Sequence, residues 1–127
     1  MSKFTLSNKE KLKSRKSIDR LFEEGKQLSL YPVKQVYIIH KLPEGQKSSL
    51  FSVSVPKRNF KRAVDRNKIK RLFREAYRLN CLELKEELTK QEKQIMLMYI
   101  YVGREIPDYH ELEKKIITLI ERTLKRI

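Results

Sequence analysis

Residues 57–78 read KRNFKRAVDRNKIKRLFREAYR and hold the densest charge in this 127-residue chain. The stretch contains ten Lys or Arg residues and only two acids, Asp65 and Glu75, which gives it a net charge of +8. The whole chain carries +14, and the segment after residue 78 has as many acids as bases. A charge concentrated in this way is typical of a surface that binds nucleic acid or an anionic membrane.

The spacing within this stretch predicts that its second half is a helix with two unlike sides. One side is apolar and is expected to pack on the core; it is formed by Ile69, Leu72, Phe73 and Ala76. On the opposite side, like charges four residues apart repel each other and destabilise the helix. A face that is only solvated has no interaction that offsets this repulsion. We therefore interpret that side as a binding face; it carries Arg66, Asn67, Lys70, Arg71, Arg74 and Arg78, with Glu75 expected to pair with Arg71 and Arg78.

Three segments outside the basic stretch predict strands. Residues 33–39 are β-branched and aromatic and follow the Tyr31-Pro32 pair, and residues 50–55 alternate between apolar side chains and serines. Residues 95–102 (IMLMYIYV) form an unbroken apolar run, which predicts a buried strand at the centre of the sheet.

Two further helices are predicted from capping residues and apolar spacing. Ser14 or Ser17 caps a helix over residues 14–25, and Gly25 is expected to end it in a left-handed conformation. Asp108 caps a helix over residues 108–126, in which Glu111 completes a capping box. The core-facing stripe of that helix consists of Leu112, Ile116, Leu119, Ile120 and Leu124.

These elements predict one α+β domain over residues 1–127, with the order α-β-β(-β)-α-β-α. Three helices pack on a single mixed sheet of about four strands, which occupies residues 33–55 and 95–102. The basic helix is expected to continue or restart over residues 79–88. Residues 1–13 show no sustained period and predict a flexible basic arm.

The sequence argues against several classes of protein. It has no apolar run of the roughly 20 residues that a membrane span needs and no secretory leader, so we expect a cytoplasmic protein without a membrane partner. The single cysteine, Cys81, is expected to be a buried apolar side chain. We find no spacing of metal ligands and no catalytic arrangement of side chains, so the predicted catalytic and metal sites are none.

The basic helix is better suited to RNA than to DNA. A helix that reads the DNA major groove needs a partner helix or a dimer to position it, and the chain has neither heptads nor zinc ligands. A rigid basic face instead suits an RNA backbone, and exposed aromatic side chains stack on single-stranded bases.

A longer motif runs through the same region: Val55-Pro56-Lys57-Arg58, Ala63-Val64, and then RNKIKRLFRE over residues 66–75. This motif closely resembles the signature of the bacterial ribonuclease P protein subunit, and the order of helices and strands resembles that family along the chain. Two positions depart from the family pattern. Lys68 stands where arginine is usual, which keeps the charge but loses the planar fork, and Ile18 stands where an aromatic residue is common.

The resemblance implies a subunit of a ribonucleoprotein endonuclease that removes the 5′ leader of precursor tRNA. It implies that the RNA subunit performs the hydrolysis with magnesium, that the protein itself holds no cofactor, and that the protein is monomeric in the complex. It also implies a fold like domain 2 of ribosomal protein S5, with a left-handed crossover that the general right-handed rule does not predict.

The resemblance also assigns residues to the two RNA partners. In the family, the basic helix packs against the RNA subunit, and a cleft between that helix and the sheet holds the single-stranded leader. The predicted RNA-binding residues are Lys57, Arg58, Lys61, Arg62, Arg66, Asn67, Lys68, Lys70, Arg71 and Arg74. The predicted leader-groove residues are Phe22, Tyr37, Ser52 and Ser54. The competing interpretation is that these side chains pack in the core or lie on a solvent-exposed face of the sheet.

Other functions stay open at this point. A structural RNA-binding protein of the ribosomal type would show the same basic face without any part in a nuclease. A protein-only nuclease would need carboxylates that converge on a metal ion, and a DNA-binding regulator would need a way to index its helix.

Overall fold

The computed structural model describes residue 12 and residues 14–127. The arm predicted for residues 1–13 therefore lies outside the described residues, apart from Leu12. Leu12 is buried, and its N–H donates to the carbonyl oxygen of Phe51 at 2.8 Å.

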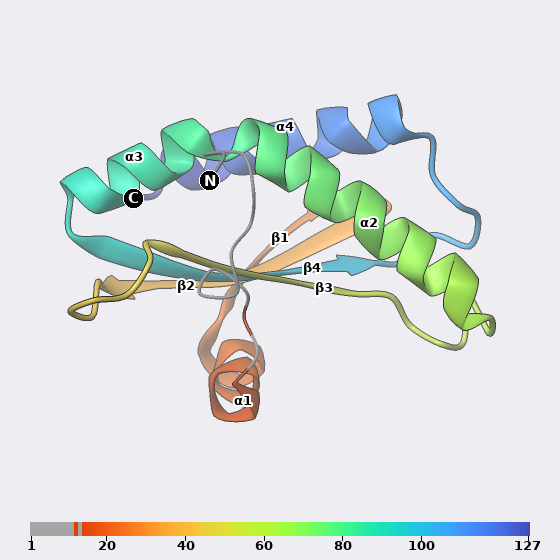
Figure 1. Ribbon diagram of the computed structural model, residues 1–127, viewed down its shortest axis with the longest axis horizontal. Coiled ribbons are helices and arrows are strands. Elements are labelled where there is room, and N and C mark those ends of the chain that lie inside the picture. The colour runs from red at the N-terminus through yellow and green to blue at the C-terminus, as the bar shows by residue number, and fades with distance from the viewer. Residues whose placement is uncertain (1–11, 13) are drawn as a thin grey trace.

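The described residues form four helices and four strands, and Figure 1 shows them in the order α-β-β-β-α-α-β-α. The restart that was one of the two alternatives for residues 79–88 occurs at Cys81, and it gives four helices instead of the three predicted. A short strand after Gly25 was not predicted, because three of its five residues are polar. The elements are α1 (Arg15–Glu24), β1 (Lys26–Leu30), β2 (Val33–Lys41), β3 (Ser49–Ser54), α2 (Ala63–Asn80), α3 (Leu82–Lys90), β4 (Lys93–Tyr101) and α4 (Tyr109–Leu124).

The strands form one mixed sheet in the order β1-β2-β4-β3. β1 and β2 are antiparallel, as are β2 and β4, whereas β3 and β4 are parallel. The apolar strand β4 has a neighbour on each side, which confirms its predicted central place.

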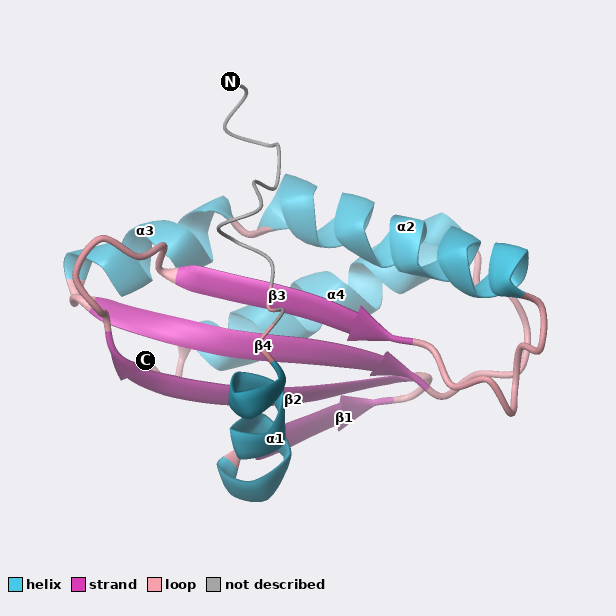
Figure 2. Cartoon of the chain, turned by 60° about the horizontal axis from the view of Figure 1, so that its bottom comes forward, coloured by secondary structure: helices cyan, strands magenta, loops and turns pink. Residues whose placement is uncertain are grey.

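The connection from β3 to β4 passes through α2 and α3 on one face of the sheet. In Figure 2 the sheet is seen from the side of α1, both strands point to the right, and β3 lies above β4 while the connecting helices pass behind. This arrangement is a left-handed crossover, as the resemblance implied and against the general rule.

Helices cover both faces of the sheet. α2, α3 and α4 lie on one face and α1 lies on the other (Figure 1). Alternate residues of β4 therefore enter two separate apolar clusters: Leu97 and Tyr99 pack beneath α2 and α4, and Met96 and Met98 pack beneath Leu21 of α1. A strand covered on both faces has no polar side, which explains its unbroken apolar run.

Aromatic rings join α2 to the sheet. The ring of Tyr77 stacks on Phe51 of β3 with centroids 4.3 Å apart, and Phe73 lies 5.8 Å from Tyr99 of β4. Ile69, Phe73, Ala76 and Tyr77 are fully buried, and Leu72 is partly buried against the same cluster. The predicted apolar side of the basic helix is thus confirmed, with Tyr77 added to it.

The helix ends follow the predicted capping, with one exception. The Ser14 hydroxyl accepts from the N–H of Ser17, and the Asp108 carboxylate accepts from the N–H of Glu111. Gly25, however, is extended, with φ −68° and ψ 149°, so the predicted left-handed conformation was wrong. A glycine is required there because a Cβ would clash with the Leu21 carbonyl oxygen and with Val36.

The burial of α2 predicts a strong effect of Phe73→Ala. Removing a fully buried phenylalanine costs about 3 to 5 kcal/mol, so we expect the free energy of unfolding in urea to fall by that amount. Val64→Ala, at a position on the same helix that is 59% exposed, should change it by less than about 0.5 kcal/mol. A loss below about 1 kcal/mol for Phe73→Ala would contradict the assigned role of α2 packing.

Candidate nucleic-acid interface

The loop that links β3 to α2 is pinned by apolar side chains and presents basic ones to solvent. Val55 and Phe60 are buried, and the Phe60 ring lies 6.0 Å from Tyr101 at the end of β4. Between them Lys57 and Arg58 are exposed. The loop backbone is therefore fixed while its charges point outward.

The basic face of α2 continues from this loop. Because Ile69, Phe73 and Tyr77 point into the sheet, the polar side chains on the other side of the helix are not covered by any helix or strand of the described part of the chain. Of the ten predicted RNA-binding residues, Lys70 and Arg66 are partly buried, and the exposed ones are Lys57, Arg58, Lys61, Arg62, Asn67, Lys68, Arg71 and Arg74.

Arg66 departs from this outward arrangement. One terminal nitrogen of its guanidinium donates to the carbonyl oxygens of Phe60 and Lys61, at 2.7 and 2.9 Å. Arg66 therefore ties the basic loop to the first turn of α2. The helix pattern places its Cα on the basic face but does not show that part of the side chain turns inward.

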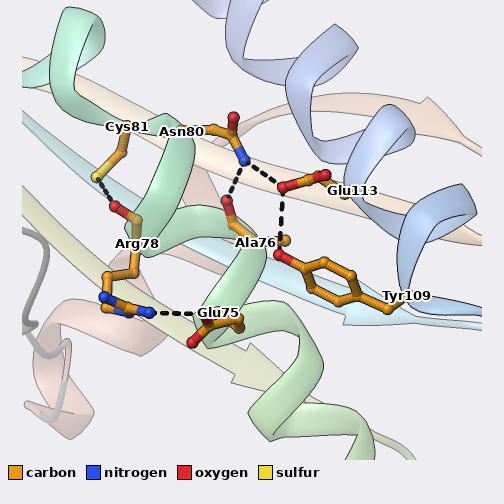
Figure 3. Close-up of polar contacts among 7 residues, drawn as sticks. All are labelled: Glu75, Ala76, Arg78, Asn80, Cys81, Tyr109 and Glu113. Atoms are coloured by element: carbon orange, nitrogen blue, oxygen red, sulfur yellow. Dashed lines mark hydrogen bonds and ion pairs between the residues drawn. The ribbon is translucent and has the colours of Figure 1, made fainter.

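The far end of α2 is held against α4 by polar contacts, which Figure 3 shows. The amide nitrogen of Asn80 donates to the carbonyl oxygen of Ala76 at 2.7 Å and to the Glu113 carboxylate at 3.0 Å. The Tyr109 hydroxyl donates to the same carboxylate at 3.2 Å. Burial, together with this hydrogen bond and the Glu113 charge, raises the pKa of Tyr109 to about 12, so the phenol stays protonated at neutral pH.

The sequence predicted that Glu75 pairs with Arg71 and Arg78; among the described residues its ion pair is with Arg78. The two side chains meet at 2.6 Å one turn apart on α2 (Figure 3). Glu75 offsets the positive charge of Arg78. The net positive charge of α2 therefore lies mainly in its first three turns. Cys81, at the end of the helix, is buried as expected.

The four predicted leader-groove residues do not all share one face. Ser52 and Ser54 pair in register with Met98 and Ile100, which lie on the α1 face of the sheet. Tyr37 lies on the opposite face, is 1% exposed, and accepts a hydrogen bond from Arg126. Tyr37 is therefore a core residue, and the structure separates it from the serines.

Phe22 lies on the α1 face with the serines. α1 crosses the sheet from Leu12, which is bonded to β3, to Gly25, which precedes β1. Leu21 points into the sheet, so its neighbours Arg20 and Phe22 lie on opposite flanks of α1. Arg20 meets His40 near the end of β2.

Phe22 consequently faces the other end of the sheet and is 53% exposed. That end carries Ser54 in register with Ile100, which pairs in turn with Lys34. The sequence prediction missed Lys34, which is exposed between the buried residues Val33 and Gln35. A lysine inside a predicted strand is the signal that this face of the strand is open to solvent.

Ser52 and Ser54 lie on the sheet face on which α1 packs, so they do not line the predicted cleft between the basic helix and the sheet. α2 packs directly on the sheet through its buried side chains, and the serines point away from it. The basic loop follows directly from β3, so the serine floor and the exposed Lys57 and Arg58 are continuous along the chain.

Within the part of the chain that the structure describes, no helix combines the length and apolar character that crossing a membrane requires. No group of three or more His, Cys, Asp or Glu residues in that part is placed to hold a metal ion.

Comparison with known proteins gives consistent matches. A family model described as Ribonuclease P matches residues 6–124. The ribonuclease P protein component of Porphyromonas gingivalis is 40% identical over 111 residues, which cover 87% of this chain and 80% of that protein. The corresponding protein of Dictyoglomus turgidum is 35% identical over 124 residues, which cover 96% of this chain and 95% of that protein.

Solved structures of the same kind share the fold. The RNase P protein of Thermotoga maritima superposes with a TM-score of 0.66 at 25% identity, over 89% of this chain and 96% of that one. The RNase P protein of Staphylococcus aureus superposes with a TM-score of 0.70 over 90% and 94%, and at 15% identity this match supports the fold alone.

The inward contact of Arg66 leads to a prediction about stability. Arg66→Ala leaves two carbonyl oxygens without their charged donor, so we expect the free energy of unfolding to fall by about 1 kcal/mol or more. Arg74→Ala, which removes an exposed charge from the same helix, should leave it nearly unchanged. Equal stabilities of the two variants in urea denaturation would show that Arg66 does not hold the loop.

Proposed function

The chain belongs to the ribonuclease P protein family, and from this premise we propose that it binds the RNA subunit of ribonuclease P and the 5′ leader of precursor tRNA. In this proposal the RNA subunit, with magnesium, carries out the hydrolysis that releases the leader. The protein contributes binding surfaces, acts as one copy per complex, and works in the cytoplasm with its RNA partners.

The observation that carries the proposal is the rigid basic surface formed by the 55–62 loop and α2. Its exposed side chains are mainly basic, although Val64 and Leu79 of α2 are also exposed, and its backbone is fixed by the buried residues Val55, Phe60, Ile69 and Phe73. Phosphate groups of a folded RNA have fixed positions, and a rigid array of cations meets them at little cost in side-chain and backbone entropy. The surface is thus suited to a structured RNA partner.

The leader is proposed to lie on the α1 face of the sheet, beside Phe22. Phe22 is an exposed aromatic ring on α1, and the sheet face on which α1 packs also carries Ser52 and Ser54. Single-stranded nucleic acid is bound in this way, by base stacking on aromatic rings and by nearby cations that track the backbone. Lys34, Lys57 and Arg58 supply the cations at that end of the sheet.

Reconstitution tests the proposed function directly. We expect the protein, added to a bacterial ribonuclease P RNA at low magnesium, to stimulate cleavage of precursor tRNA. Arg71→Ala combined with Arg74→Ala should require a higher protein concentration for the same stimulation, because two exposed cations of α2 are lost. Lys114→Ala with Arg122→Ala, which removes two exposed charges from α4, is the matched control.

The reconstitution also separates the proposal from the structural RNA-binding class. A protein of that class would bind the RNA with the same basic face and leave cleavage unchanged. Intact binding without any stimulation would therefore overturn the proposed role in ribonuclease P.

The leader groove gives a second prediction. Base stacking on an aromatic ring is worth about 1 to 3 kcal/mol, so Phe22→Ala should weaken binding of leader-bearing precursor tRNA to the reconstituted complex by that amount. Affinity for mature tRNA, which lacks the leader, should stay the same. Phe22→Tyr keeps the ring and should bind as the wild type does; equal losses for precursor and mature tRNA would exclude leader contact at Phe22.

A further inference from the structure

A second basic region lies at the opposite end of the sheet from the 55–62 loop. It is a pocket of about 720 Å³ at the place where β2 ends and β4 begins, next to Lys41 and Lys93. The basic loop follows the last residues of β3, which is parallel to β4, so the pocket and the loop lie at opposite ends of the strands. We call this cavity the β2-edge pocket.

The pocket forms because β1 is shorter than β2. The pairing of β1 with β2 begins at Lys26 opposite Tyr37, so residues 38–41 of β2 extend past the end of β1. Leu42 donates its N–H to Glu92 on the β4 side. In an antiparallel strand alternate residues point their main-chain groups to opposite edges, so Ile39 and Lys41 direct theirs toward the pocket.

Basic side chains dominate the lining. The pocket is lined by five Lys or Arg residues and two acids, Glu24 and Glu92. Glu24 forms an ion pair with Arg20. With His40 neutral the lining carries a net charge of +3. The five basic residues are Arg20, Lys26, Lys41, Lys93 and Arg126.

Two of the guanidinium groups are held in place from opposite sides of β2. On the α1 side, Arg20 donates to Glu24 at 2.8 Å and contacts His40 Nδ1 at 3.3 Å. On the α4 side, Arg126 donates to the Tyr37 hydroxyl at 3.1 Å. A guanidinium has five N–H donors, more than these partners accept, and its planar fork matches the oxygens of a phosphate.

A partly buried chain of hydrogen bonds orients the His40 ring toward Arg20. Gln94 is 1% exposed, and its amide nitrogen donates to the Lys47 carbonyl oxygen and the Gln46 side chain. Its amide oxygen therefore faces His40 Nε2, which donates to it at 2.6 Å. In the neutral ring Nδ1 is then an acceptor, which suits the N–H of Arg20.

We propose that the β2-edge pocket binds a backbone phosphate of the ribonuclease P RNA subunit, as a second anchor in addition to α2; this inference rests on the proposed function. Arg20 lines the pocket from one flank of α1, whereas Ser54, proposed for the leader, lies toward the other end of the strands. A nine-residue strand is about 30 Å long. A folded RNA that contacts both ends of the sheet fixes the orientation of the protein.

The test uses the full chain and the RNA subunit alone, without precursor tRNA. Lys41→Ala with Lys93→Ala removes two pocket cations that take no part in the hydrogen bonds of Arg20 and Arg126. This double substitution should weaken RNA binding about tenfold. Lys41→Arg with Lys93→Arg should bind like the wild type. The control pair on α4, Lys114→Ala with Arg122→Ala, should stay within about twofold, and equal melting temperatures would show that every variant is folded.

The outcomes distinguish the pocket from the proposed function. If the Lys41 and Lys93 variant binds RNA like the wild type while the Arg71 and Arg74 variant is weakened, the pocket proposal is wrong and the proposed function stands. If neither variant is weakened, both fail. A loss seen only with leader-bearing precursor tRNA in the reconstituted complex would assign the pocket to the leader and overturn the proposal.

Discussion

The packing of α2 on β3 and β4 is the contact on which the rest of the structure depends. Tyr77 stacks on Phe51, and Phe73 meets Tyr99 and Tyr101, so one side of the helix is fixed by large rings. Such aromatic contacts add about 0.5 to 1.5 kcal/mol each beyond the burial of their area. That stabilisation offsets the mutual repulsion of the cations on the outer side, and it keeps them in one fixed array.

The opposite face of the sheet is organised by a much smaller helix. Leu21 of α1 packs on Val36, Met96 and Met98, and the two flanks of α1 then face different ends of the strands. One flank carries the exposed ring of Phe22, and the other places Arg20 in the lining of a basic pocket. A single short helix therefore divides the sheet surface into two regions of different chemistry, while α2 supplies a third on the other side.

Several features of the fold are predictable from the sequence because each depends on a local pattern. The apolar run of β4, the two-sided spacing of α2, and the caps at Ser14 and Asp108 were all read from neighbouring residues. β1 was missed because an edge strand with exposed Lys26, Gln27 and Ser29 has little apolar signal. Its place depends on pairing with β2, which a local pattern does not encode.

In the candidate RNA-binding site, too, some residues are predictable from a local pattern and others are brought together only by the fold. The exposed cations of α2 followed from helix spacing, and the family motif named them. Tyr37 was misplaced because Val36 and Tyr37 are both buried, one on each face of a covered sheet, so alternation gives no direction. The β2-edge pocket was not predicted, because its five basic residues come from separate parts of the chain that only the fold brings together.

The central claim, that α2 acts as a rigid array of phosphate contacts for a structured RNA, is tested most directly by the salt dependence of RNA affinity. Each lost phosphate contact lowers the slope of log affinity against log salt by about 0.7 to 0.9. Replacement of both Arg71 and Arg74 by alanine is therefore predicted to make the slope shallower by about 1.4 to 1.8 relative to the wild type. An unchanged slope would contradict the account.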